Sequence, residues 1–181
     1  ENLFTNNKIN NFYNNFFIDA NLWYRITRSK SIYASIRNSR NMPQIRQLQP
    51  VTNTTNPLNI ITGNPDLSPT LNTRLYVNFN NYNWQEKRGC YAHLGIDLQE
   101  DQIVSITTTG EDLVRTTTYT NVNGTYNVYG GLNLDKTFEL DSLQTIKVTP
   151  GLYGNIFKRI GFSNGERFNV ENLSLNPSVR I

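Results

Sequence analysis

Residues 71–79, LNTRLYVNF, alternate side chains of two kinds, and this alternation decides the fold class. One set of alternate positions is mostly apolar and comprises Leu71, Thr73, Leu75, Val77 and Phe79. The other is polar and comprises Asn72, Arg74, Tyr76 and Asn78. Successive side chains of a strand point to opposite faces of a sheet, whereas a helix repeats every 3.6 residues. The pattern therefore predicts a β-strand with one apolar and one polar face.

The same period of two recurs along the chain and predicts about eight long strands. The others are expected at 17–27, 32–40, 91–98, 103–122, 126–137, 144–157 and 168–181. The stretch 103–122 is rich in threonine and broken at 110–112, so it is either one strand with a bulge or two short strands. Tilted membrane strands need about 9–11 residues, more than the 5–6 typical of soluble sheets, so the predicted lengths favour a membrane barrel.

Charged side chains in the six better-defined strands fall on one register. That register holds Asp19, Arg25, Arg74, Asp97, Asp135, Lys147 and Arg180, and the opposite register holds no Asp, Glu, Lys or Arg. An Arg or Lys that faces lipid at the membrane centre costs about 2–4 kcal/mol, whereas a lumen-facing charge stays hydrated. We therefore predict an all-β, antiparallel up-and-down meander. The half-buried sheets of a soluble sandwich show the same alternation.

Composition excludes several classes of function. The 181 residues include 28 asparagines and carry a net charge of only +3 with scattered Lys and Arg, so nucleic acid is not an expected partner. A single cysteine, Cys90, and a single histidine, His93, provide no disulfide framework and no zinc-binding set. The first residues lack the features of a signal peptide, and no apolar run reaches the roughly 20 residues of a membrane helix. We expect no metal and no cofactor.

A nearly uncharged passage, MPQIRQLQPVTNTTNPLNIITGNPDLSP at residues 42–69, separates two predicted strands. Its prolines are Pro43, Pro50, Pro57, Pro65 and Pro69. Each proline fixes a backbone angle and biases the preceding residue toward extended geometry. The passage is therefore expected to be an ordered connector, a loop that follows one course over a surface.

Three parts of this region, RNSRNMP at 37–43, QLQP at 47–50 and NPLNIITGNPDLSP at 56–69, resemble the outer-membrane β-barrel region of TonB-dependent receptors from Bacteroidetes-type bacteria. The family wording is Arg-Pro, Leu-Asn-Pro and Gly-Asn-Pro-x-Leu-x-Pro-Glu. Here Asn41 and Met42 precede Pro43, Gln49 replaces the asparagine and Thr70 replaces the glutamate. The resemblance implies that residues 1–181 form one segment of a larger transmembrane β-barrel of roughly 22 strands.

The resemblance also implies a function without covalent chemistry: uptake of a large nutrient across the outer membrane of a Gram-negative bacterium. The implied partners are outer-membrane lipid, the remainder of the barrel and its plug, TonB through a missing N-terminal part, and a surface lipoprotein. Residues 84–88 are expected to form a long loop that contributes to capture. The alternative is a soluble β-sandwich, a binding module or adhesin that recognises glycan or protein.

Individual residues give little support for an enzyme. His93 is the sole candidate general base, and a polar residue on a lumen-side surface is the better interpretation. Asp97 and Asp135 invite comparison with glycosidase carboxylates, but sequence alone does not place them together. Cys90 is expected to be a small buried or interfacial residue, and Gly130 and Gly131 are expected to allow close strand packing or a bend. No catalytic residue is predicted.

Aromatic residues lie mostly near predicted strand ends, where membrane barrels place girdles. They are Trp23, Tyr24, Tyr82, Trp84, Tyr91, Tyr119, Tyr126 and Tyr153. The girdle or cross-strand packing is the favoured interpretation, and a sugar-stacking platform is the alternative. Asn53 and Asn172 lie in N-x-Ser/Thr sequons, which matter only on a eukaryotic secretory route.

Overall fold

The computed structural model describes residues 13, 16–50 and 56–181, and it is almost entirely β-structure. Its one helix, α1 (Ile45–Leu48), has four residues. The strands are β1 (Asp19–Arg25), β2 (Lys30–Asn41), β3 (Asn59–Ile61), β4 (Thr70–Asn83), β5 (Arg88–Glu100), β6 (Gln102–Thr109), β7 (Arg115–Val122), β8 (Thr125–Glu139), β9 (Thr145–Ser163) and β10 (Glu166–Arg180). Within the described ranges, no helix has the length and apolar character needed to cross a membrane.

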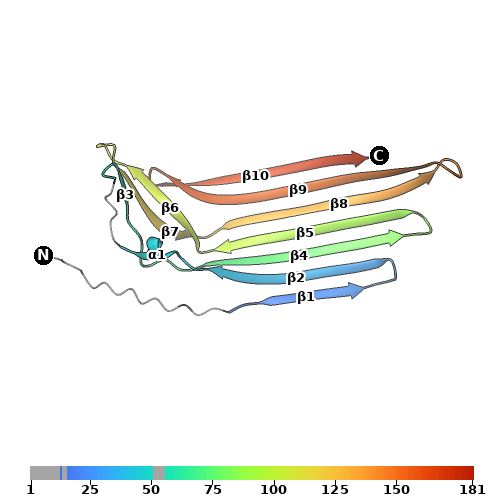
Figure 1. Cartoon of the computed structure of the whole chain (residues 1–181), viewed down its shortest axis with the longest axis horizontal. Coiled ribbons are helices and arrows are strands. Elements are labelled where there is room, and N and C mark those ends of the chain that lie inside the picture. Colours follow the sequence, from blue (N-terminus) through green and yellow to red (C-terminus); the bar gives the residue numbers. More distant parts are fainter. Residues whose placement is uncertain (1–12, 14–15, 51–55) are drawn as a thin grey trace.

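Seven long strands form the main sheet in the order β1-β2-β4-β5-β8-β9-β10. Every neighbouring pair in this order is antiparallel, and Figure 1 shows the strands side by side as one broad ribbon. The all-β antiparallel meander predicted from sequence is confirmed. The sheet is not closed, because β1 and β10 remain as its two edges.

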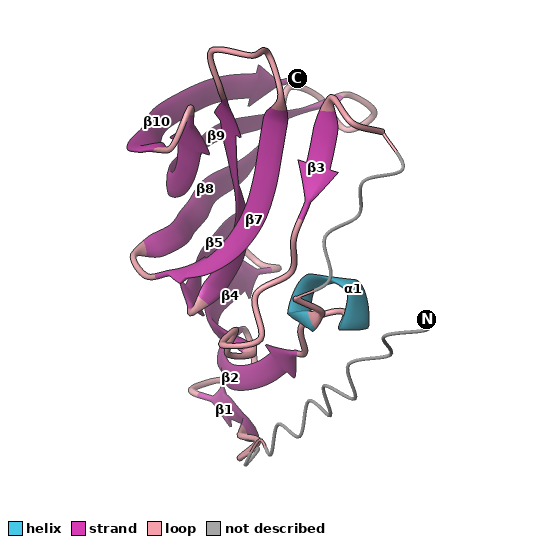
Figure 2. Cartoon of the chain, turned by 90° about the vertical axis from the view of Figure 1, so that its left-hand side faces the viewer, coloured by secondary structure: helices cyan, strands magenta, loops and turns pink. Residues whose placement is uncertain are grey.

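The chain leaves the main sheet twice, between β2 and β4 and again between β5 and β8. Strands from these two excursions form a second sheet in the order β3-β7-β6, in which β3 runs parallel to β7. Figures 1 and 2 place this second sheet at the end of the main sheet where β2 and β5 end. The threonine-rich stretch is therefore two strands, as one of the two predictions had it, but both lie outside the main sheet.

The proline-rich passage, described at 42–50 and 56–69, contains two elements that the sequence did not predict: α1 and β3. Gln44 and Gln47 form a reciprocal capping box that satisfies backbone donors at the start of α1. Gly63 lies so close to the chain after α1 that a Cβ there would be 2.3 Å from the carbonyl oxygen of Gln49. Tertiary contacts thus shape this passage, and its residues 51–55 lie outside the described part.

Short turns join the long strands at the other end of the main sheet (Figure 1). They span 26–29, 84–87 and 140–144. The expectation of a long capture loop at 84–88 is wrong, because β4 continues to Asn83 and β5 already begins at Arg88. At the opposite end, beside the second sheet, the β9–β10 hairpin turns on Asn164 and Gly165, with φ of 50° and 84°, which is the geometry that an Asn-Gly turn favours (Figure 1).

The few buried apolar side chains lie where the second sheet meets the main one. Leu67, Val122 and Ile160 are only 2%, 6% and 5% exposed. Two buried threonines nearby have their hydroxyls satisfied: Thr70 donates to the carbonyl oxygen of Asp101 at 3.1 Å, and Thr125 donates to a side-chain oxygen of Gln102 at 2.7 Å. This junction fixes the excursions against the end of the long strands.

Candidate functional site

The strand register gives the main sheet two chemically different faces. Arg74 lies opposite Asp97, and Asp97 lies opposite Asn127, so these side chains share a face that we call the polar face. Leu75, the residues opposite it on the neighbouring strands, and every second residue along each strand from these lie on the other side, which we call the apolar face. The segregation of charge predicted along single strands therefore holds across the sheet.

Three consecutive rows of the apolar face contain no charged side chain on any of the seven strands. The first row is Ala20, Ile36, Leu75, Ile96, Val128, Ile156 and Leu173; the second is Leu22, Ala34, Val77, Leu94, Gly130, Gly154 and Leu175; the third is Tyr24, Ile32, Phe79, Ala92, Leu132, Leu152 and Pro177. We call these three rows the apolar band.

The apolar band is uncovered. Val77, Leu94 and Leu132 are 45%, 47% and 40% exposed, although each lies on an inner strand of the seven-stranded sheet. A soluble sandwich buries such side chains beneath a second sheet. The second sheet of this chain lies at the end of the main sheet instead, so the structure argues against the sandwich alternative (Figure 1).

Charged residues appear directly beyond the apolar band on the same face. Lys158 and Glu171 border one side, with 3.0 Å between the lysine Nζ and the glutamate Oε1, and Lys30 borders the other. Along β4 these borders correspond to Thr73 and Asn81, a span of nine residues. A membrane strand needs about 9–11 residues, and lysines at the border can extend their ammonium groups to water.

Ion pairs cross the polar face in one row. Arg37 and Arg74 lie directly opposite each other, and each guanidinium has an acid on its far side. Arg37 Nη2 is 2.9 Å from Asp19 Oδ2, and Arg74 Nε is 2.5 Å from Asp97 Oδ1. These pairs relieve the repulsion that two facing arginines would otherwise produce.

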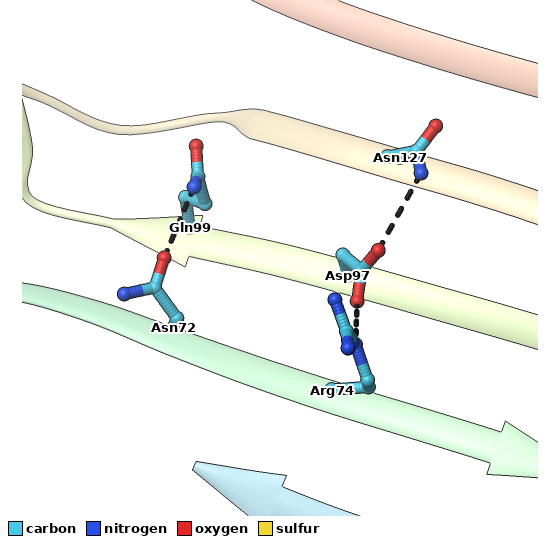
Figure 3. A network of polar contacts seen from close by, with 5 residues as sticks. All are labelled: Asn72, Arg74, Asp97, Gln99 and Asn127. Atoms are coloured by element: carbon cyan, nitrogen blue, oxygen red, sulfur yellow. Dashed lines mark hydrogen bonds and ion pairs between the residues drawn. The ribbon is translucent and has the colours of Figure 1, made fainter. Parts of the chain in front are cut away.

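Amides continue this row, as Figure 3 shows around Asp97. Asn127 Nδ2 donates to Asp97 Oδ2 at 3.4 Å, and Asn155 Nδ2 donates to Asn127 Oδ1 at 2.6 Å. In the neighbouring row, Gln99 Nε2 donates to Asn72 Oδ1 at 3.0 Å (Figure 3). The polar face therefore presents a hydrogen-bonded layer of charges and amides that suits a water-filled lumen.

A hollow of about 620 Å³ lies over this layer, near the end that carries the second sheet. Its lining includes Arg37, Ser39, Asn41, Asn72, Arg74, Asp97, Gln99, Thr125, Asn127, Asn155, Phe157 and Arg159. The hollow is thus built from five adjacent strands, β2, β4, β5, β8 and β9. Its walls combine guanidinium groups, amides and one carboxylate.

An aromatic cluster centred on His93 lies further along the polar face. The His93 ring centroid is 5.6 Å from that of Tyr91, 6.4 Å from Tyr76 and 6.3 Å from Tyr153. A Cβ at Gly131, the residue opposite His93, would be 2.7 Å from His93 Cε1, so the ring lies over that glycine. His93 is therefore a polar-face residue packed among rings, as its better interpretation predicted.

The aromatic girdle is only partly supported. Tyr24 and Tyr126 lie on the apolar face. By register, Trp23, Tyr82, Tyr91 and Tyr153 lie on the polar face, where they cannot meet lipid. Trp84 stacks edge-on against Tyr82 in the turn after β4, with 4.7 Å between ring centroids, and Tyr119 belongs to β7 in the second sheet. A position near a strand end suggested a girdle. Whether an aromatic residue lies on the apolar or the polar face, however, depends on its place in the alternation along the strand.

The two candidate carboxylates do not form a pair. Asp97 faces Asn127 of β8, and Asp135 lies eight residues further along that strand, about 27 Å away. Glycosidases hold their carboxylates roughly 5–9.5 Å apart. Each aspartate has a local partner instead, Arg74 for Asp97 and Thr149 for Asp135.

The other residues singled out from the sequence lie at positions that the strand packing explains or that carry no site. Cys90 is a half-buried free thiol, and a Cβ at Gly130 would be 2.9 Å from the His93 carbonyl oxygen, so this glycine allows close strand packing. Asn172 lies on the polar face, and Asn53 lies outside the described residues. Across 13, 16–50 and 56–181, no group of His, Cys, Asp or Glu could hold a metal ion.

Sequence reasoning missed two arginines of the hollow. Arg37 lies within the predicted strand 32–40, but its place in the polar row becomes visible only through the register with Asp19 and Arg74. Arg159 lies beyond the predicted end of its strand at residue 157, whereas β9 continues to Ser163. The alternation of Asn155 and Arg159 with Ile156 and Ile160 is the weak signal that extends it.

Comparison with known proteins agrees with this two-faced sheet. The model of a family described as outer membrane protein beta-barrel family matches residues 1–180. A search of the curated proteins gave no significant match. The family match places the protein in the outer membrane, where the apolar band can face hydrocarbon. The chain belongs to the outer membrane protein beta-barrel family.

Proposed function

We propose that this chain forms part of the barrel wall of a TonB-dependent receptor that imports a large nutrient and does no covalent chemistry itself. The observation that carries the proposal is the pairing of an uncovered apolar band with a hydrated polar face on one open sheet. The resemblance of residues 63–69, GNPDLSP, to the receptor motif supports the finer assignment. A lumen lined by the polar face would give the nutrient its passage.

Strand direction constrains what completes the barrel. Adjacent strands alternate in direction across the seven-stranded sheet, so its first and last strands, β1 and β10, run in the same direction. They therefore cannot join each other in an antiparallel pair. Bacterial barrels have an even number of antiparallel strands. The remainder must therefore contribute an odd number, and a barrel of roughly 22 strands satisfies this because it leaves fifteen.

The two ends of the sheet support an orientation. Both excursions lie at one end, and turns of four or five residues join the strands at the other. Outer-membrane barrels have long loops outside and short turns in the periplasm. We place the second sheet on the external side, so it replaces residues 84–88 as the part that contributes to nutrient capture.

The partners follow from this arrangement. Outer-membrane lipid covers the apolar band, the remaining strands pair with β1 and β10, and a plug occupies the lumen below the external mouth. TonB engages a more N-terminal part of the whole protein, and a surface lipoprotein can meet the external excursions. These assignments rest on the resemblance together with the open, two-faced sheet.

The test uses the full-length parent protein in outer membranes. The purified periplasmic domain of TonB, carrying a photocrosslinker, is added to solubilised membranes. We expect a crosslink to the parent protein that excess unlabelled TonB domain abolishes. A folded outer-membrane barrel that TonB never captures would contradict the receptor assignment while leaving family membership intact.

A further inference from the structure

Among the residues that the structure describes, one arginine of the hollow has no acidic partner. Arg159 lines the hollow from β9, and its Cζ lies 5.0 Å from the centroid of the Phe157 ring. None of the six ion pairs among the described residues includes it. An arginine stacked on an aromatic face keeps its N–H donors available at the edge of the guanidinium plane.

The hollow therefore carries an uncompensated positive charge. Its lining contains three arginines and one carboxylate. Arg37 and Arg74 are neutralised by Asp19 and Asp97 respectively. The charge of Arg159 remains, in a concave site whose walls raise the local concentration of anions.

Neutral amide side chains line other parts of the same hollow. Asn72 accepts from Gln99 through its Oδ1, which leaves its amide nitrogen available to a ligand, as Figure 3 shows. The volume of about 620 Å³ matches small-molecule sites, which occupy roughly 300–1,000 Å³, and it exceeds what one acidic side chain would fill. The chemistry suits an anionic group attached to a polar body.

We propose that this hollow is a subsite for an anionic group of the imported ligand, a carboxylate, phosphate or sulfate, which Arg159 binds through charge-assisted hydrogen bonds. The inference rests on the proposed function for the presence of an imported ligand. It adds the chemical class of the group that the lumen recognises, and it places that group near the external mouth.

Isothermal titration calorimetry of the full-length protein in detergent at low salt tests this site. The probes are inorganic phosphate, sulfate and citrate, with maltose as the neutral control. We expect at least one anion to bind and maltose not to compete with it. Arg159→Gln should weaken that binding roughly tenfold, because it removes the charge-assisted hydrogen bonds to the anion. Arg159→Lys, which keeps the charge, should weaken it less.

Arg180→Gln is the matched control. Among the described residues, Arg180 is another polar-face arginine without an ion pair, and it lies in β10 at the other end of the strands from the hollow. This variant should bind the anion as the wild type does. Unheated gel mobility verifies that each variant is a folded barrel. Failure of all three anions to bind, or equal weakening by Arg159→Gln and Arg180→Gln, overturns the subsite. TonB crosslinking of the same proteins is unaffected by that result, so it separates this failure from failure of the receptor assignment.

Discussion

The main sheet and the second sheet treat apolar side chains in opposite ways. The main sheet exposes Val77 and Leu94, at 45% and 47%, in the middle of its apolar band. The junction with the second sheet buries Leu67 and Val122, at 2% and 6%, as a soluble domain would. The two regions therefore suit different surroundings. The main sheet relies on lipid to cover its apolar face, whereas the excursions bury a small core of their own in water.

The two regions also differ in where their side chains form hydrogen bonds. At the junction, Asn121 makes three hydrogen bonds that join the proline-rich passage to the excursions: its Oδ1 accepts from Ser68 N, and its Nδ2 donates to the carbonyl oxygens of Ser68 and Asp101. On the main sheet, side-chain bonds are confined to the polar face in the spanning rows. The following changes test this contrast.

The largest effect is expected at the buried junction. Leu67→Ala should destabilise the excursions by about 2–5 kcal/mol, because truncating a buried leucine loses burial and leaves a cavity. Hydrogen exchange of the β6 and β7 amides in the full-length protein measures this loss. Leu113→Ala, at a side chain that is 76% exposed, is the control and should change little. Equal protection in both variants would mean that the junction has no core.

A charge in the apolar band should cost nearly as much. Val77→Arg places a guanidinium at the centre of the band and should reduce stability in phospholipid bilayers by about 2–4 kcal/mol. Asn78→Arg, one residue along β4 on the polar face, should cost far less because it stays hydrated. Reversible folding into lipid vesicles gives both values. Similar costs for the two variants would contradict the assignment of faces.

Loss of the Asn121 contacts should have an intermediate effect. Asn121→Ala leaves the Ser68 backbone N–H and two carbonyl oxygens without this partner, at a cost of about 1–3 kcal/mol. Hydrogen exchange at Ser68 and Ile103 should rise. Asn169→Ala, at an exposed position of β10, is the matched control. An unchanged exchange rate at Ser68 would show that the passage is held by other contacts.

The smallest effect is expected on the polar face. Asp97→Asn removes the ion pair with Arg74, which stands on a face that water reaches, and should cost about 0–1 kcal/mol. The difference from wild type should shrink further as salt rises. Folding measurements at low and high salt check this. A loss of several kcal/mol would instead indicate a dry, buried pair.

Sequence predicted the parts of the fold that depend on side-chain alternation alone. The residues from Leu71 to Phe79 gave both the strand and its faces, because a period of two is fixed by strand geometry. Asn164 and Gly165 carry another local signal, since Asn and Gly tolerate the positive φ that the β9–β10 turn needs.

The rest depended on contacts between distant residues. The three residues of β3 are a strand only because β7 lies beside them, and Arg37 joins a polar row only because the register sets it opposite Arg74. For Trp23 and Tyr153 the sequence predicted either a lipid girdle or cross-strand packing; the register places both on the polar face, where Tyr153 packs beside His93. The residues within one segment do not reveal which distant strand will pair with it, so these contacts could not be predicted from the sequence.

Site-directed spin labelling along β4 tests the central claim most directly, in the full-length protein within bilayers and with Cys90 replaced by serine. Single labels at Asn72, Tyr76 and Asn78 are compared with labels at Leu75, Val77 and Phe79. The two-faced sheet predicts that the second set is accessible to oxygen dissolved in lipid and protected from a water-soluble nickel complex, with the reverse for the first set. Accessibility that fails to alternate with a period of two would contradict it.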